Sequence, residues 1–320
     1  MSERQSVEVP QPEHKEHEPK INYHFLYSAH RTAEDFSNLE EAFKKADIYV
    51  PEVVGWTMQD QEDYQAVSDG EMLPEQFGHD VAGHRLQALR VMHDSKKPIL
   101  LADLHLTDEI TDEYKDIRNQ GERALTAFTR GEFFESLKLL RVYVERSAKL
   151  QLKRENKIKE NLDKRIKWFL EENPEYSNNK ELNVLIKLGS AHTTLYHKLK
   201  GEGRSVSREF KEQPEIYTFL NELVRKQLFN KTIDNELLAR GIFDNFLIPN
   251  FYPITNNSNK AIWVSRKITS RLSLRDIKEI SEKAGKNKGK IDIVQELETR
   301  GIKVPKTEAE MDKLVGPHKK

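Results

Sequence analysis

The chain of 320 residues contains no cysteine. Without cysteine, a protein has no disulfide bond, no thiolate metal site, no iron–sulfur cluster and no cysteine nucleophile. A metal ion in this protein must therefore be bound by histidine, by carboxylates or by carbonyl oxygens.

The sequence also has no long apolar run. No segment approaches the roughly 18 to 20 apolar residues that a membrane-spanning helix needs. The first twenty residues contain prolines and charges of both signs in place of the apolar core of a signal peptide. We therefore expect residues 1–20 to form a disordered tail, and the protein to be cytoplasmic and without membrane association.

An excess of charge of one sign is absent as well. The 52 lysine and arginine residues balance 53 aspartate and glutamate residues, and the net charge is −1. The protein thus has no overall field that would attract nucleic acid. Nucleic-acid binding is therefore not expected of the chain as a whole, and it would need a local basic surface.

The order of the predicted elements indicates an α/β fold across residues 21–255. Strands are predicted from apolar, β-branched and aromatic runs at 22–28, 46–54, 98–103 and 183–189. A helix with apolar side chains at helical spacing joins the first two runs. Because strand, helix and strand alternate, we predict a central mixed sheet flanked by long helices.

Helical spacing dominates most of the remaining chain. Apolar residues recur every three or four positions between 112 and 170, which predicts long helices with a break at Gly131. Two more helices are predicted at 207–240, and an apolar packing loop is predicted at 242–254. These segments supply the helices that flank the sheet.

The composition changes beyond residue 255, and we predict a helical C-terminal extension at 256–320. Within it, a loop rich in glycine and lysine separates two helical patterns. This arrangement resembles the helix, basic loop and helix of SAP-like nucleic-acid-binding modules. The alternative is a charged helical hairpin that closes the fold or binds a partner, which the neutral overall charge favours.

Candidate site residues lie where predicted strands end. Ser-Ala-His closes an apolar run twice, at His30 and at His192, and Glu52 follows the second strand. Ligands and catalytic groups in open α/β sheets gather at such strand ends. Asp103 and His105 also end an apolar run, where they could contribute to a site, but we expect Asp103 to cap the following helix.

One charged pair lies within a helical apolar stripe. Arg154 falls between Leu150 and Ile158 on the apolar face, so an inward guanidinium would need buried partners. The alternative is an exposed charged face on which Glu155 pairs with Lys159, four residues later. The residues alone favour the exposed face.

Together these features resemble the TraB/Tiki family and its erythromycin-esterase-like and ChaN-like relatives. That family has two Gly-x-x-His motifs at strand ends, an acidic residue after the second strand and a helical Arg-Glu or Arg-Asp pair. Gly189 to His192 matches one motif in full, and residues 28–30 match the other in part. Tyr27 stands where the family has glycine, which lets the backbone approach a ligand.

The resemblance implies a hydrolase of peptide or ester bonds. It places His30, Glu52 and His192 as ligands of a divalent Mn, Co or Zn ion that activates water. Glu155 would act as the general base, and Arg154 would stabilise the oxyanion.

Two further functions fit the same residues. A histidine could activate water directly, without a metal, as the erythromycin-esterase resemblance implies. A non-catalytic member could instead bind a peptide or a small molecule in the same cleft and act as a regulatory protein. The departure at Tyr27 supports this last function.

Overall fold

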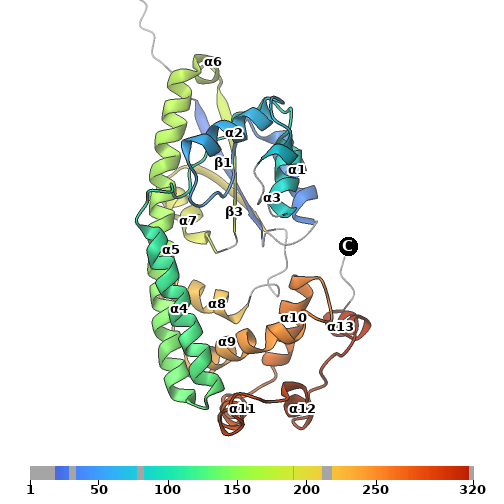
Figure 1. The fold of residues 1–320 in the computed structure, drawn as a ribbon. Coiled ribbons are helices and arrows are strands. Elements are labelled where there is room, and N and C mark those ends of the chain that lie inside the picture. The colour runs from blue at the N-terminus through green and yellow to red at the C-terminus, as the bar shows by residue number, and fades with distance from the viewer. Residues whose placement is uncertain (1–18, 29–33, 78–82, 190, 211–217, 317–320) are drawn as a thin grey trace, which may run out of the picture.

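The computed structural model describes residues 19–28, 34–77, 83–189, 191–210 and 218–316. The predicted tail at 1–18 and the site residue His30 lie outside these ranges. A part built on a β-sheet and a part built only of helices lie along one long helix (Figure 1). No helix in the described ranges is long and apolar enough to span a bilayer.

The sheet has four strands in the order β2-β3-β1-β4. They are β1 (Lys20–Ser28), β2 (Ile48–Val50), β3 (Glu181–Gly189) and β4 (Ser205–Phe210). The α/β class is confirmed, and every pairing among these strands is parallel where we expected a mixed sheet. The reason is that helical connections return the chain to the same edge before each new strand begins.

A further segment extends the sheet beyond β2. Ile99 forms an isolated parallel bridge with Tyr49, and the Leu100 N–H donates to the Tyr49 carbonyl. The predicted strand at 98–103 is thus an extended segment beside β2, with only this bridge. Its end lies at the carboxyl edge of the sheet, where β1, β2 and β3 also end.

Helices cover both faces of the sheet, as the alternation of side chains along parallel strands requires. Leu26, Tyr49 and Leu185 face one layer, formed by α1 (Glu34–Lys45), α2 (Met58–Ser68), η1 (Pro74–Gln76) and α3 (Gly83–Met92). The neighbouring residues Phe25, Val50 and Ile186 face the other layer. That layer is formed by the C-terminal half of α5 (Phe133–Glu172), by α6 (Pro174–Ser177) and by α7 (Thr193–Gly201).

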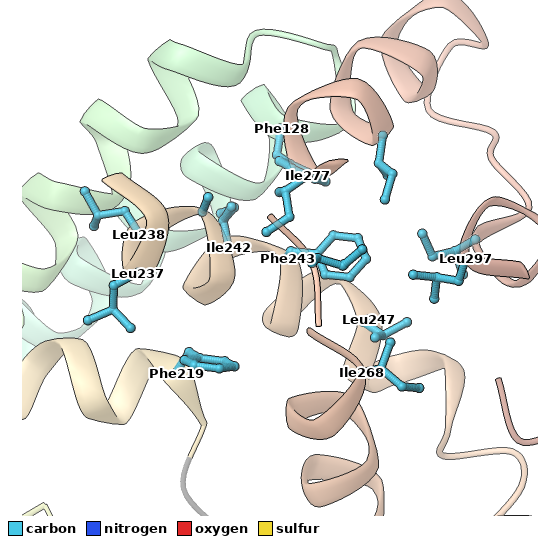
Figure 2. Close-up of a cluster of buried hydrophobic side chains, with 14 of the residues drawn as sticks. Phe128, Phe219, Leu237, Leu238, Ile242, Phe243, Leu247, Ile268, Ile277 and Leu297 are labelled. Atoms are coloured by element: carbon cyan, nitrogen blue, oxygen red, sulfur yellow. The ribbon is translucent and has the colours of Figure 1, made fainter. Parts of the chain in front are cut away.

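The helical part has its own apolar core, drawn in Figure 2. The N-terminal half of α5 contributes Leu137, Leu140 and Val144 to this core. The other helices are α4 (Ile110–Thr129), α8 (Phe219–Leu228), α9 (Asn235–Leu247), η3 (Ile248–Asn250), α10 (Ser258–Thr269), α11 (Leu274–Lys286), α12 (Ile293–Glu298) and α13 (Glu308–Val315). This core therefore includes residues on both sides of position 255.

Two predicted elements differ from the structure. Residues 207–210 belong to β4, because Val206 and Phe210 pack on the sheet core beside β1. Residues 242–247 belong to α9 and not to a loop. Ile242, Phe243 and Leu247 are buried on one helical face, and the prolines that suggested a loop come after the helix ends.

Glycines allow α11 to cross the turn between α4 and α5. Gly131 has a φ of +82°, so it ends α4 at the predicted break. A Cβ at Gly285 would lie 2.4 Å from the carbonyl oxygen of Arg130. The backbones are therefore in direct contact, and Ser281 adds a hydrogen bond to the Phe128 carbonyl at 2.7 Å.

Candidate functional site

A buried ion network lies at the carboxyl edge of the sheet. Arg154 donates from Nε to Asp103 Oδ1 at 2.9 Å and from Nη2 to Asp103 Oδ2 at 2.5 Å. Its Nη2 also donates to Glu52 Oε1 at 2.7 Å. One guanidinium thus joins α5 to the chain segments that follow β2 and the bridge at Ile99.

Arg154 faces inward, so the exposed alternative is wrong. The residue is only 7% exposed, and Asp103 beside it is 2% exposed. Burial alone lowers the pKa of Arg154, but the hydrogen bonds and charge of Asp103, and then the charge of Glu52, raise it above its ordinary value. The guanidinium therefore stays charged and its carboxylate partners are compensated.

Asp103 does not have the capping role that we expected. Its Oδ1 accepts from the N–H of the adjacent Leu104 at 2.7 Å, and both of its carboxylate oxygens bind Arg154. Its carbonyl oxygen accepts from Trp56 Nε1 at 2.8 Å and from Asn161 Nδ2 at 3.1 Å. Asp103 thus connects three segments through both its side chain and its backbone.

His192 lies between two carboxylates. It precedes α7 and is 2% exposed. Its Nε2 is 3.3 Å from Glu52 Oε1, and its Nδ1 is 3.7 Å from Glu155 Oε1. The ring is thereby positioned where β3 ends, next to the acceptor that Arg154 also binds.

Gln151 fixes the arrangement on the Nδ1 side of His192. Its Nε2 lies 2.7 Å from His192 Nδ1 and 3.0 Å from Glu155 Oε1. An amide NH₂ donates to both, so Nδ1 is an acceptor and the ring proton is on Nε2, toward Glu52. This assignment of the tautomer follows from the hydrogen-bond network.

Glu155 is fully buried, and its other oxygen accepts from the Thr194 hydroxyl. The exposed pair with Lys159 that we considered does not form, because Lys159 contacts Asp163 and Glu202. Glu155 contacts His192 from α5, and the preceding residue, Arg154, contacts Asp103 and Glu52.

Tyr27 fills the strand end at the position where the TraB/Tiki family has glycine. Its ring is buried and stacks on Phe210 with centroids 4.7 Å apart. Its hydroxyl donates to the His192 carbonyl oxygen at 3.0 Å. Burial, with a smaller contribution from Glu155, raises the pKa of Tyr27, so this hydroxyl stays protonated as a donor.

A second tyrosine, Tyr114 of α4, lies near Arg154. Its hydroxyl is buried and interacts with the Arg154 guanidinium. Burial raises the pKa of Tyr114, and the charge of Arg154 and its hydrogen bond to the hydroxyl oppose the rise.

The described residues do not by themselves form a metal site. Within the described ranges, no group of three histidine, aspartate or glutamate side chains is arranged to hold a metal ion. Glu52 accepts from Arg154 and from the Gly189 N–H, and both ring nitrogens of His192 face hydrogen-bond partners. The predicted Mn, Co or Zn ion and the role of His30 stay predictions.

The structure brings together four of the five predicted site residues, namely Glu52, Arg154, Glu155 and His192. The sequence did not reveal Asp103, Gln151, Thr194 or Tyr114 as their partners. Asp103 carried the same signal as Glu52, an acidic residue at the end of an apolar run.

The chain was compared with models of known protein families, with curated proteins and with solved structures, and nothing matches.

Proposed function

We propose that the network around His192 is the catalytic site of a hydrolase of peptide or ester bonds, of the type that the TraB/Tiki resemblance implies. The observation that carries the proposal is the position of His192 between Glu52 and the Gln151–Glu155 pair. A histidine oriented by carboxylates is the common arrangement for moving protons in hydrolysis.

In the proposed reaction, the Gln151 amide moves off Nδ1 of His192, the ring nitrogen without a proton, and Nδ1 takes a proton from the attacking water. The hydroxide oxygen then bonds to the substrate carbonyl carbon, and the histidine returns the proton to the leaving amine or alcohol. Glu52 and Glu155 stabilise the imidazolium that forms in between. Since Glu155 contacts His192 and not solvent, its proposed role changes from general base to positioning carboxylate.

Arg154 keeps the proposed role of stabilising the oxyanion. Its Nε and Nη2 bind the carboxylates, and among the described residues Nη1 makes none of these ion pairs. The buried hydroxyl of Tyr114, which interacts with Arg154, is a second donor beside it. Fixed donors of this kind need no reorganisation when charge develops on the substrate oxygen.

The test is hydrolysis of a panel of nitrophenyl esters and fluorogenic peptides by the full chain, purified without a histidine tag. We expect His192→Gln to reduce hydrolysis by about 100-fold or more, as loss of a general base does. His197→Gln is the matched control, because His197 lies on α7 with an exposed side chain, and we expect it to keep full activity. Equal activity of the two variants would overturn the proposal.

The same preparation can be analysed for a bound metal ion. A stoichiometric divalent ion in elemental analysis that disappears in His192→Gln would support metal-assisted hydrolysis. Activity that survives a chelator but is lost in both His192→Gln and His30→Ala would support the metal-free route.

Tyr27 favours a second candidate, a non-catalytic protein that binds a peptide or small molecule. Its buried ring and its hydrogen bond to the His192 carbonyl occupy the strand end that glycine leaves open. If no member of the panel is hydrolysed, saturable binding of a peptide that His192→Gln weakens would support this function.

A further inference from the structure

A hollow of about 280 Å³ lies beside the Arg154 network. Its walls come from Trp56 after β2, from His105, Thr107 and Asp108 after the bridge segment, and from one face of α5. Lys157, Asn161 and Arg165 lie on that face because they are spaced by four residues. The hollow is therefore at the carboxyl edge of the sheet, where α/β proteins bind ligands.

Positive charge dominates the lining. The lining contains three cationic side chains, Lys157, Lys164 and Arg165, and one carboxylate, Asp108. Lys157 lies 3.5 Å from Asp108 and Lys164 pairs with Glu160 at 2.7 Å. The lining thus carries three cations for one anion.

Arg165 has no carboxylate partner among the residues that the structure describes. Its guanidinium lies 4.6 Å from the centre of the Trp56 ring and 3.8 Å from the Met58 sulfur. Partial burial lowers the pKa of Arg165, since its charge has lost water without gaining an opposite charge. An anion in the hollow would supply that charge and accept the planar guanidinium donors.

Neutral groups around the hollow are held in place. The backbone N–H of Thr107 donates to His105 Nδ1 at 3.3 Å, which leaves the ring proton on Nε2 as a further donor. Trp56 and Asn161 both donate to the carbonyl oxygen of Asp103. The walls are thus pre-formed, and they share Asp103 with the Arg154 network.

Apolar side chains form a rim next to these cations. Met58 is 55% exposed, Leu106 60% and Trp168 48%. Met58 and Trp168 both lie against Arg165, and the Leu106 N–H donates to the Trp56 carbonyl. Exposed apolar groups gathered around a charged hollow indicate a ligand with an apolar part.

We propose that this hollow binds the carboxylate or phosphate group of a ligand whose apolar or aromatic part lies on the Met58–Leu106–Trp168 rim. Arg165 holds the anion, and Lys157, Lys164 and the Nε2–H of His105 assist. This binding site is formed by residues other than His192, and it does not depend on hydrolysis at His192. Its link to that network is Asp103, whose carbonyl fixes the hollow and whose carboxylate holds Arg154.

The test is ligand titration followed by tryptophan fluorescence, because two of the three tryptophans, Trp56 and Trp168, lie at the hollow. The full chain carrying Trp263→Phe removes the signal from the helical part. Phenyl phosphate and phenylacetate present the two anionic groups on one ring, and benzyl alcohol is the uncharged counterpart. We expect saturable binding of at least one anion and none of the alcohol.

Arg165→Gln should weaken binding of the anion roughly tenfold or more, since it removes a charge-assisted hydrogen-bond donor. Arg118→Gln is the matched control, because the Arg118 side chain is 81% exposed on α4, and it should leave affinity unchanged. The two anions distinguish a phosphate site from a carboxylate site. No saturable binding, equal binding of the alcohol, or equal losses in the two variants would overturn the proposal.

Discussion

Arg154 and Asp103 face each other as a buried bidentate pair, with Nε–Oδ1 and Nη2–Oδ2 distances of 2.9 and 2.5 Å. They are separated by 51 positions in the sequence, and their contact fixes α5 against the carboxyl edge of the sheet. When a buried ion pair loses one member, the other remains as an uncompensated charge.

Asp103→Asn should therefore lower the free energy of unfolding by about 3 kcal/mol, the low end for a broken buried pair, because Glu52 still compensates Arg154. Urea denaturation followed by circular dichroism measures the change. Glu122→Gln breaks the exposed pair with Arg118 and should cost less than about 0.5 kcal/mol. Similar losses in the two variants would contradict the structural role of Asp103.

Tyr27→Phe should cost about 1 kcal/mol, because it removes one buried hydrogen bond to the His192 carbonyl and keeps the ring. Tyr27→Gly should cost about 3 to 5 kcal/mol through the cavity it leaves. Thermal unfolding of both variants, with the exposed Tyr252→Phe as the control, checks this order. A Tyr27→Gly variant as stable as Tyr27→Phe would be inconsistent with the packing described.

Asp244, buried in the helical part, should make stability depend on pH. Burial raises its pKa to about 6, although hydrogen bonds from Ser265 and from the Phe219 N–H oppose the rise. Since the folded pKa exceeds the ordinary value of 3.8, the folded state holds the proton more tightly. This stabilisation is complete below about pH 4 and is lost as the pH rises through about 6.

The difference in unfolding free energy between the natural protein and Asp244→Asn should thus shrink by on the order of 3 kcal/mol across that interval. Urea denaturation at half-unit steps of pH measures it. A difference that stays constant with pH would show that Asp244 does not titrate in this range.

Gly285→Ala should disrupt the crossing of α11 over the turn between α4 and α5. The added Cβ would lie 2.4 Å from the Arg130 carbonyl oxygen, so backbone must move, at a cost of about 1 to 3 kcal/mol. Gly201→Ala is the control, because a Cβ there meets nothing within 4 Å. Hydrogen exchange should show faster opening of α11 in the first variant only.

The sequence indicated the helices and the strand ends because their signals are local. Apolar spacing predicted the helices, the glycine predicted the break at Gly131, and the ends of apolar runs marked Glu52 and His192. The partners of these residues were not predictable, since they depend on how α5 crosses the sheet edge. Asp103 is compatible with a helix cap until the inward guanidinium of Arg154 is placed beside it.

Two secondary-structure errors have related causes. The strand β4 carries Arg208 and Glu209, and only its pairing with β1 in the folded protein defines it as a strand. The end of α9 resembles a loop in the sequence because Pro249 and Pro253 follow it closely. In both places tertiary packing outweighs the local pattern.

The length of α5 has a mechanical consequence. Its 40 residues make a rod of about 60 Å, anchored in the helical core by its first half and in the sheet core by its second half. A tilt of about 5° at one end displaces the other by about 5 Å. Because Arg154 and Glu155 lie midway along this rod, a load that tilts the helical part strains the bonds to Asp103 and His192 before it reaches the rest of the sheet.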